Sequence, residues 1–312
     1  MIKRAPILLF CYKRLESLQQ TVKALEKCVL APESELYIFS DGAKTDKDQL
    51  QIDQVRTYVK GIKGFKKVTV NESPKNKGLA TSIIEGVSEV MKFSDRVIVL
   101  EDDLLVSGNF LAYMNEGLEF YAGCSEIFSV TGYTIPINIP KGYKYDVYYL
   151  PRTSSWGWAT WKNRWEGIDW EVSDFIEFSK NKKSIRAFNR GGSDMFAMLK
   201  KQMNNEIDSW AIRWSYHQFK INSYSVFPTS SKVQNIGFTS DATNTNVFNR
   251  YYTTLDNGSA LNFNFSNEIP LDPIFLGQVQ RFFSVQNRIV SRIKTYLFKA
   301  KKLGISLKSN LL

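Results

Sequence analysis

Hydrophobic and polar positions follow two kinds of pattern in the first hundred residues. Short runs of aliphatic and aromatic residues are typical of buried strands, and they cover 7–10, 36–40, 67–70 and 97–100. The segments between them are helical in pattern or composition, and they cover 15–25, about 46–60 and 78–91. Strands that alternate with helices predict an α/β fold with parallel β-α-β units and helices on both faces of the sheet.

The pattern changes after about residue 127. Short strand-like runs mix there with loops, and five tryptophans fall between Trp156 and Trp170. Clustered tryptophans are typical of a core, and a sugar-stacking surface is the alternative for Trp156 or Trp158. Because we find no repeat and no low-complexity linker, we expect the halves 1–127 and 128–272 to share one cleft.

A third pattern begins near residue 273. Hydrophobic residues recur there at helical spacing, basic residues lie between them, and no acidic residue follows Asp272. This composition predicts a basic amphipathic helix within a tail that covers 273–312. The helix either lies on an anionic membrane surface or packs on the core with a solvated basic face.

Composition narrows the class of protein. The chain has 312 residues, 43% hydrophobic content and a formal net charge of +10, so it can bury a sizeable core and favours anionic partners. Its three cysteines form no CxxC pair, which argues against a zinc site or a disulfide framework. No stretch is long and apolar enough to span a membrane. We therefore expect a cytoplasmic protein, peripheral on the inner face of the cell membrane if the tail binds lipid.

Three consecutive carboxylates follow the last aliphatic run, at Glu101, Asp102 and Asp103. Like charges this close raise one another's pKa, and a divalent cation is the usual remedy. Carboxylate oxygens select Mg²⁺ or Mn²⁺ over softer metals. Ligands of parallel sheets bind at the carboxyl ends of strands, where the triplet and Asp41 are both expected. A solvated acidic turn is the alternative to a metal site.

The segment 97–104 resembles the DxD region of GT-A glycosyltransferases, and most of all the inverting N-acetylglucosaminyltransferase I-like group, whose triplet is also Glu-Asp-Asp followed by Leu. Asn76-Lys77-Gly78 resembles the Asn-x-Gly helix start of family 2-like bacterial glycosyltransferases. Further segments between about 5 and 245 resemble that first group: Tyr12-Lys13-Arg14, Ser40-Asp41-Gly42, 129–132, Arg152 with Trp156-Gly157-Trp158, Asp208-Ser209-Trp210 with Arg213, and 228–237.

The resemblance implies a GT-A fold, with a Rossmann-like nucleotide-sugar-binding sheet and a mixed acceptor-side region. It implies metal-dependent transfer, with inversion, from a UDP-sugar, UDP-GlcNAc being one candidate. Asp103 would be the direct ligand of Mn²⁺ or Mg²⁺, Asp102 would hold the ribose or assist the metal, and Glu101 would contact the donor sugar. Asp41 would accept the uracil N3–H.

Two predicted arginine contacts and one aromatic contact complete the donor side. Arg14 would approach the phosphates, and a surface arginine is the alternative. Arg152 would hold a phosphate or orient Asp103, and a structural ion pair is the alternative. Trp156 would line the cleft.

The resemblance also places the catalytic base before Trp210, where one Asp precedes the Trp and Ser209 stands in place of a second. Asp208 is the first choice as base and Glu206 the second. A purely structural role for Asp208 as a helix N-cap is the alternative.

Other functions fit the sequence less well. A sugar nucleotidyltransferase needs a glycine-rich loop after the first strand, and 11–15 contains no glycine. A non-catalytic glycan- or nucleic-acid-binding module fits the basic charge. However, that charge is concentrated in the tail and the triplet is intact, so we expect no nucleic-acid partner. We expect a glycan or lipid-linked glycan acceptor, in bacterial surface-polysaccharide assembly.

Overall fold

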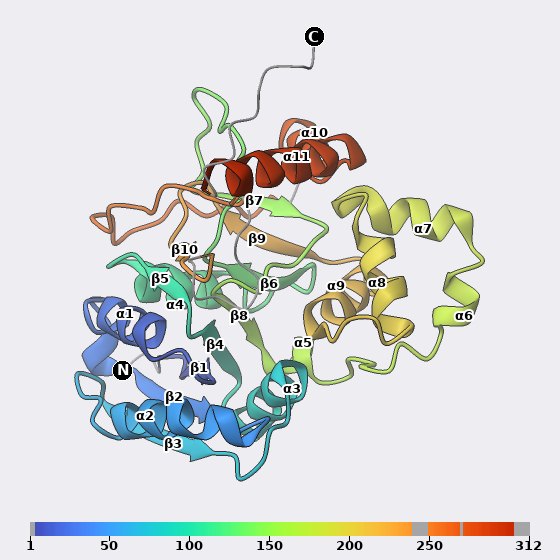
Figure 1. Cartoon of the computed structure of the whole chain (residues 1–312). Helices are drawn as coiled ribbons and strands as arrows, with labels where there is room; N and C mark the ends of the chain where they lie inside the picture. Colours follow the sequence, from blue (N-terminus) through green and yellow to red (C-terminus); the bar gives the residue numbers. More distant parts are fainter. Residues whose placement is uncertain (1–3, 239–248, 269–270, 303–312) are drawn as a thin grey trace.

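A computed structural model describes residues 4–238, 249–268 and 271–302. Its centre is a sheet of eight strands that runs through both halves of the chain (Figure 1). In spatial order these are β3 (Lys67–Glu72), β2 (Glu35–Ser40), β1 (Ile7–Cys11), β4 (Arg96–Glu101), β8 (Trp158–Trp161), β6 (Ile127–Thr131), β9 (Tyr224–Pro228) and β7 (Val147–Leu150).

Strand direction divides the sheet into two parts. The first four strands are mutually parallel, with Leu9 of β1 opposite Ile38 on one side and Leu100 on the other. The strand β8 runs antiparallel to both β4 and β6, and β9 then pairs with β6 in parallel and with β7 antiparallel. The predicted α/β fold is confirmed, and its sheet continues past residue 127 without a break.

Helices cover both faces of the sheet. Successive side chains of β1 point to opposite faces, so neighbouring residues of this strand pack against different helices. Ile7 and Leu9 pack with α1 (Leu15–Glu26), α2 (Gln49–Lys60) and α4 (Phe110–Phe120). Leu8 and Phe10 pack with α3 (Leu79–Val90) and α9 (Trp210–Lys220) on the other face. In the described part of the chain before residue 270, the other helices are η1 (Ala31–Glu33), η2 (Asp46–Asp48), α5 (Lys162–Trp165), α6 (Phe175–Phe178), α7 (Lys182–Phe188), η3 (Asn189–Gly191) and α8 (Met195–Met203).

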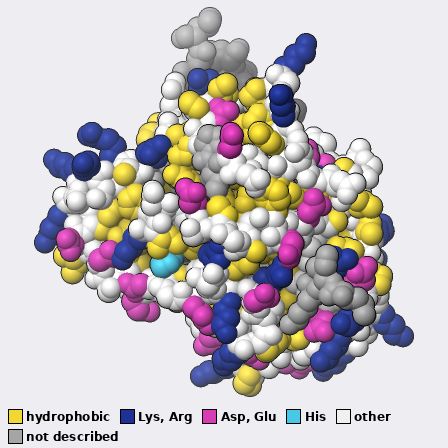
Figure 2. Space-filling view, turned by 180° about the vertical axis from the view of Figure 1, so that it is seen from behind, with side chains coloured by type: hydrophobic (Ala, Val, Ile, Leu, Met, Phe, Trp, Pro, Cys, Tyr) yellow, Lys and Arg dark blue, Asp and Glu magenta, His cyan; other side chains and the backbone are white. Residues whose placement is uncertain are grey.

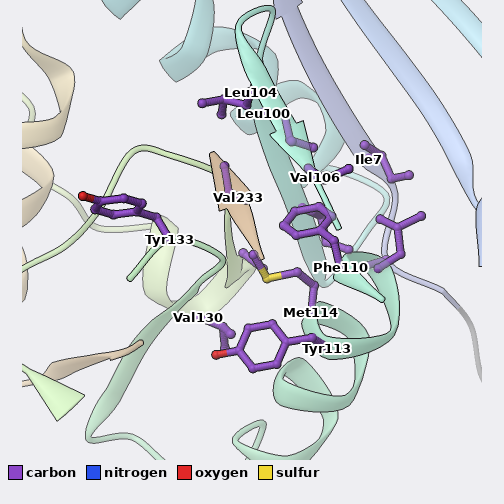
Figure 3. Packing of buried hydrophobic residues seen from close by; sticks show 14 of the residues in the cluster. Ile7, Leu100, Leu104, Val106, Phe110, Tyr113, Met114, Val130, Tyr133 and Val233 are labelled. Atoms are coloured by element: carbon purple, nitrogen blue, oxygen red, sulfur yellow. The ribbon is translucent and has the colours of Figure 1, made fainter. Parts of the chain in front are cut away.

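A short second sheet closes the core beside the end of β4. Its strands β5 (Leu104–Val106) and β10 (Val233–Asn235) pair antiparallel, although about 130 residues separate them in sequence. Figure 3 shows Val233 of β10 beside Phe110 and Met114 of α4 in the buried cluster. This pairing fixes residues 235–237 next to Asp103, and the Ile236 N–H donates to the Asp103 carbonyl at 2.8 Å.

The tail forms two helices, α10 (Pro273–Phe282) and α11 (Val285–Lys302), so the prediction of a single helix was wrong. The break lies at 283–284, where the Ser284 Oγ accepts the Asn287 N–H at 3.2 Å and so caps the second helix. Residues 303–312 of the predicted tail lie outside the described part of the chain. None of the helices in the described ranges has the length and hydropathy needed to cross a membrane.

Candidate functional site

The ends of β1, β2 and β4 meet at one edge of the sheet, as parallel neighbours must. A cavity of about 460 Å³ opens there. Its lining includes Tyr12, Arg14, Asp41, Asn76, Glu101, Asp102 and Asp103, and we call it the acidic cavity. Five of the residues predicted from sequence therefore share one cavity.

Arg14 contacts two members of the triplet. Its guanidinium pairs with the Asp102 carboxylate and, through Nη1, with Asp103 Oδ2 at 2.9 Å. The Tyr12 N–H donates a further hydrogen bond to Asp102 Oδ2 at 3.3 Å. In this structure the arginine supplies positive charge to carboxylates that were expected to need a cation.

One arginine does not remove the electrostatic cost of the triplet. Burial raises the pKa of Asp102 to about 6, with Arg14 opposing and Asp103 adding to the rise. Burial, Asp103 and Asp102 together raise the pKa of Glu101 to about 8. Each raised pKa means that the ionised form lacks compensation, so additional positive charge would bind favourably here.

The side chains around the triplet limit the number of protein ligands that a metal ion would have. Within the described ranges, no group of three or more His, Cys, Asp or Glu side chains is arranged to hold a metal ion. A Mg²⁺ or Mn²⁺ ion at Asp103 and Asp102 would therefore take most of its oxygen ligands from water or from a bound phosphate. The two carboxylates fit such a site as partial ligands.

Gly237 is a site residue that our sequence reasoning did not identify. A Cβ at this position would overlap Asp103 Oδ2, so the backbone approaches the carboxylate more closely than any other residue type allows. The Gly237 N–H donates to Asn235 Oδ1 at 2.8 Å, which fixes the turn. The contact depends on long-range pairing of β10 with β5, which local sequence does not reveal.

Asp41 holds the loop before α3. Its carboxylate accepts the backbone N–H groups of Lys77 at 2.9 Å and Gly78 at 3.0 Å, and the Asn76 side-chain amide at 3.0 Å. The Gly42 N–H adds a fourth donor at 2.9 Å. These donors already occupy the oxygens that were predicted to accept a uracil N–H, so Asp41 joins the end of β2 to the start of α3.

Asp208 lies at the rim of the acidic cavity. A Cβ at Gly78, which lines that cavity, would be 3.7 Å from Asp208 Oδ2, and Arg213 Nη2 lies 3.8 Å from its Oδ1. The N-cap of α9 is Ser209, whose Oγ accepts the Ile212 N–H at 3.4 Å, so the capping role considered for Asp208 is wrong. Its side chain is 64% exposed and lies beside Gly78, at the edge of the cavity lining.

The second candidate base, Glu206, accepts a hydrogen bond from Asn204 at 3.0 Å. Of the two candidates, Asp208 is the one placed beside a residue that lines the acidic cavity.

Arg152 and Trp156 line a different cavity, of about 310 Å³, which we call the aromatic cavity. Arg152 makes a bidentate ion pair with Asp194, both bonds being 2.9 Å, and its guanidinium stacks on the Phe283 ring at 3.7 Å. This is the structural ion pair given as the alternative, and it replaces the predicted phosphate contact. Trp156 packs edge-on against Tyr133, with ring centroids 4.6 Å apart.

The other tryptophans are buried in the core, except Trp170, which is partly buried and packs against it. Trp158 is fully buried, and its ring lies 4.4 Å from that of Trp214 and 5.2 Å from that of Trp210. The aromatic cavity is also lined by Ala211 and Ile212, in the first turn of α9, so it lies close along the chain to Asp208.

No protein-family model matches this chain, and no curated protein matches it. Among solved structures, the mannosyltransferase PcManGT from Pyrobaculum calidifontis, in complex with GDP-Man and Mn²⁺, is 12% identical over 57% of this chain and 52% of its own, with a TM-score of 0.35. TarS from S. aureus is 12% identical over 54% of this chain and 30% of its own, with a TM-score of 0.36. A structure of TarS 1–349 is 7% identical over 74% and 60%, with a TM-score of 0.39.

The chain therefore spans less than two thirds of each of these structures. At these TM-scores and identities, the likenesses do not establish a function.

Proposed function

We propose that the chain is a metal-dependent glycosyltransferase that moves a sugar from a nucleotide-sugar to an acceptor hydroxyl. One observation carries the proposal: a cavity of about 460 Å³ gathers Arg14, Asp41 and the triplet Glu101-Asp102-Asp103 at the carboxyl ends of parallel strands. That edge of a parallel sheet is where nucleotides bind in related architectures. The residue types match a diphosphate, its counter-ion and a sugar.

In this proposal Asp103 and Asp102 hold the Mn²⁺ or Mg²⁺ ion. When bound, the ion would neutralise charge on the leaving diphosphate. Arg14 now pairs with both carboxylates and is partly exposed, so it can turn its guanidinium to a phosphate once a cation replaces it. Glu101, at the wall of the same cavity, would contact the donor sugar.

The nucleotide is proposed to be UDP, on the sequence resemblance alone. The Asp41 carboxylate already accepts four N–H groups, so a uracil N3–H would have to share one of its oxygens. We assign Asp41 the role of fixing the 76–78 loop, which lines the cavity at the expected position of the nucleotide.

Asp208 is the proposed catalytic base. Its carboxylate is exposed at the cavity rim, and an acceptor hydroxyl placed between it and the donor would lose its proton to Oδ2 as it attacks with inversion. The acceptor would extend from there toward the aromatic cavity, where Trp156, partly exposed, offers a ring surface to a sugar. A glycan or lipid-linked glycan fits such a lining.

The test is a screen of nucleotide-sugars for Mn²⁺-dependent thermal stabilisation, followed by assays of donor turnover. We expect stabilisation by a UDP-sugar, loss of metal-dependent turnover in Asp103→Ala, and unchanged turnover in the exposed control Asp53→Asn. Stabilisation by no nucleotide-sugar, or full turnover in Asp103→Ala, would contradict the proposal.

A second pair of variants identifies the base. Asp208→Asn should retain UDP binding and lose transfer by roughly 10²- to 10⁴-fold, the usual contribution of a general base. Glu206→Gln should transfer normally. The reverse pattern would assign the base to Glu206.

A further inference from the structure

The helix α11 presents its hydrophobic stripe to solvent. Val285, Ile289, Ile293 and Tyr296 are 56%, 51%, 53% and 66% exposed. Their spacing of four, four and three residues places them on one side of the helix. A helix that packs on a core through its apolar side would show the opposite exposure.

The opposite side of α11 is polar and holds the helix to the body. The Asn287 side-chain amide donates to the Arg281 carbonyl at the end of α10, at 2.7 Å. Arg288 reaches Ser193 Oγ at 3.5 Å, and Ser193 in turn donates to the Phe283 carbonyl at 2.9 Å. Asn287, Arg288 and Ser291 are half-buried while the hydrophobic stripe is exposed, so the predicted alternative of a core-packed helix with a solvated basic face is wrong for this part of the tail.

The positive charge of the tail indicates which kind of partner the stripe binds. Residues 273–302 contain seven Lys or Arg and no Asp or Glu, which accounts for most of the net charge of +10. On the face shown in Figure 2, by contrast, basic and acidic side chains are intermixed. A second copy of this helix would bring like charges together, whereas anionic lipid headgroups complement them.

We infer that the outward side of α11 docks on an anionic membrane surface. The stripe of Val285, Ile289, Ile293 and Tyr296 enters the boundary between headgroups and acyl chains, and Arg292, exposed beside it, contacts lipid phosphates. The inference does not depend on the proposed function, because it uses no residue of the acidic cavity.

Docking through α11 would also bring the aromatic cavity close to the bilayer. Phe283, immediately before the helix, lines that cavity and covers Arg152. An acceptor carried on a lipid would then reach the cavity without leaving the membrane.

The experiment is vesicle flotation of the full chain. Vesicles of phosphatidylcholine with about one third phosphatidylglycerol should bind it, and binding should weaken in high salt, since exposed charges are screened. Vesicles of phosphatidylcholine alone should bind at least tenfold more weakly. Binding that is equal on both vesicles, or absent from both, would overturn the inference.

One double variant and one single control variant locate the binding surface. Ile289→Ser with Ile293→Ser should weaken binding about tenfold or more, because it removes two of the four side chains that enter the bilayer. The matched control Ile176→Ser changes an isoleucine that is 70% exposed on α6 and should bind normally. Both sets change exposed residues, so thermal melting should be unchanged.

Two results would overturn the assignment of α11. Undiminished flotation of the Ile289/Ile293 variant would place lipid binding elsewhere. A dimer by light scattering, dissociated by the same substitutions, would show that the stripe pairs with a second copy. Donor turnover without vesicles should be equal in all variants, which separates this test from that of the proposed function.

Discussion

Arg14 is the residue whose replacement most directly tests the triplet as a cation site. It is shared by Asp102 and Asp103, whose side chains are 5% and 12% exposed, and is itself 31% exposed. The substitution Arg14→Met keeps most of the length and removes the charge. Two buried carboxylates then lose their common partner, and their mutual repulsion is left uncompensated.

The size of the effect follows from burial. Removing one partner of a fully buried ion pair costs about 3–5 kcal/mol, and surface pairs contribute about 0–1 kcal/mol. Because Arg14 is partly exposed, we expect a loss of about 2–3 kcal/mol in the free energy of unfolding. For a chain of 312 residues, the average unfolding entropy converts this into a fall in Tm of about 3–5 °C.

Mn²⁺ should reverse most of this loss. The ion takes the place of the missing charge, and it no longer competes with the arginine, so its stabilisation should be larger in Arg14→Met than in the native chain. Scanning calorimetry with EDTA and with excess Mn²⁺ measures both Tm values directly.

Arg4→Met is the matched control. Arg4 pairs with Glu33 at 2.9 Å, where Glu33 is 56% exposed, so its loss should cost less than about 1 kcal/mol and leave the Mn²⁺ response unchanged. Equal Mn²⁺ shifts in all three proteins, or no shift in any, would refute the reasoning that Arg14 and a metal share these carboxylates.

Three further predictions follow from single contacts. Gly237→Ala should displace the Asp103 carboxylate and weaken Mn²⁺ binding at least tenfold in titration calorimetry, because its Cβ overlaps Oδ2. Arg152→Met and Asp194→Asn should each cost about 3–5 kcal/mol in denaturant unfolding, with the double variant costing less than their sum, since each single change leaves a buried partner. Ser209→Ala should cost about 1 kcal/mol through loss of the N-cap of α9, measured the same way, with donor KM unchanged.

The first hundred residues were predictable because their structure is recorded in local patterns. A parallel strand buried on both faces is a short run of aliphatic residues, as 7–10 and 97–100 show. The structure of the second half could not be predicted in this way, because it depends on pairing between segments that are distant in sequence. No local pattern indicates that Trp158–Trp161 lies between β4 and β6, or that the tail breaks at 283–284.

The candidate site divides in the same way. The side chains that follow strands, such as Arg14, Asp41 and Asp103, could be placed from sequence because parallel strands end at a common edge. Gly237 could not be placed from sequence. It contacts Asp103 because β10, a strand from late in the chain, pairs with β5. For Arg152, the motif was recognised from sequence but the ion-pair partner was not. That partner, Asp194, lies in a loop 42 residues away.

The positions of α9 and of the start of α11 show how the two cavities lie along the chain relative to the proposed membrane surface. Asp208 precedes α9 at the rim of the acidic cavity, and the first turn of the same helix lines the aromatic cavity. Phe283, which also lines that second cavity, lies two residues before the start of α11. In the proposed function, a lipid-linked acceptor would thus enter from the membrane side, cross the aromatic cavity and present its hydroxyl to Asp208, while the donor occupies the acidic cavity beyond it.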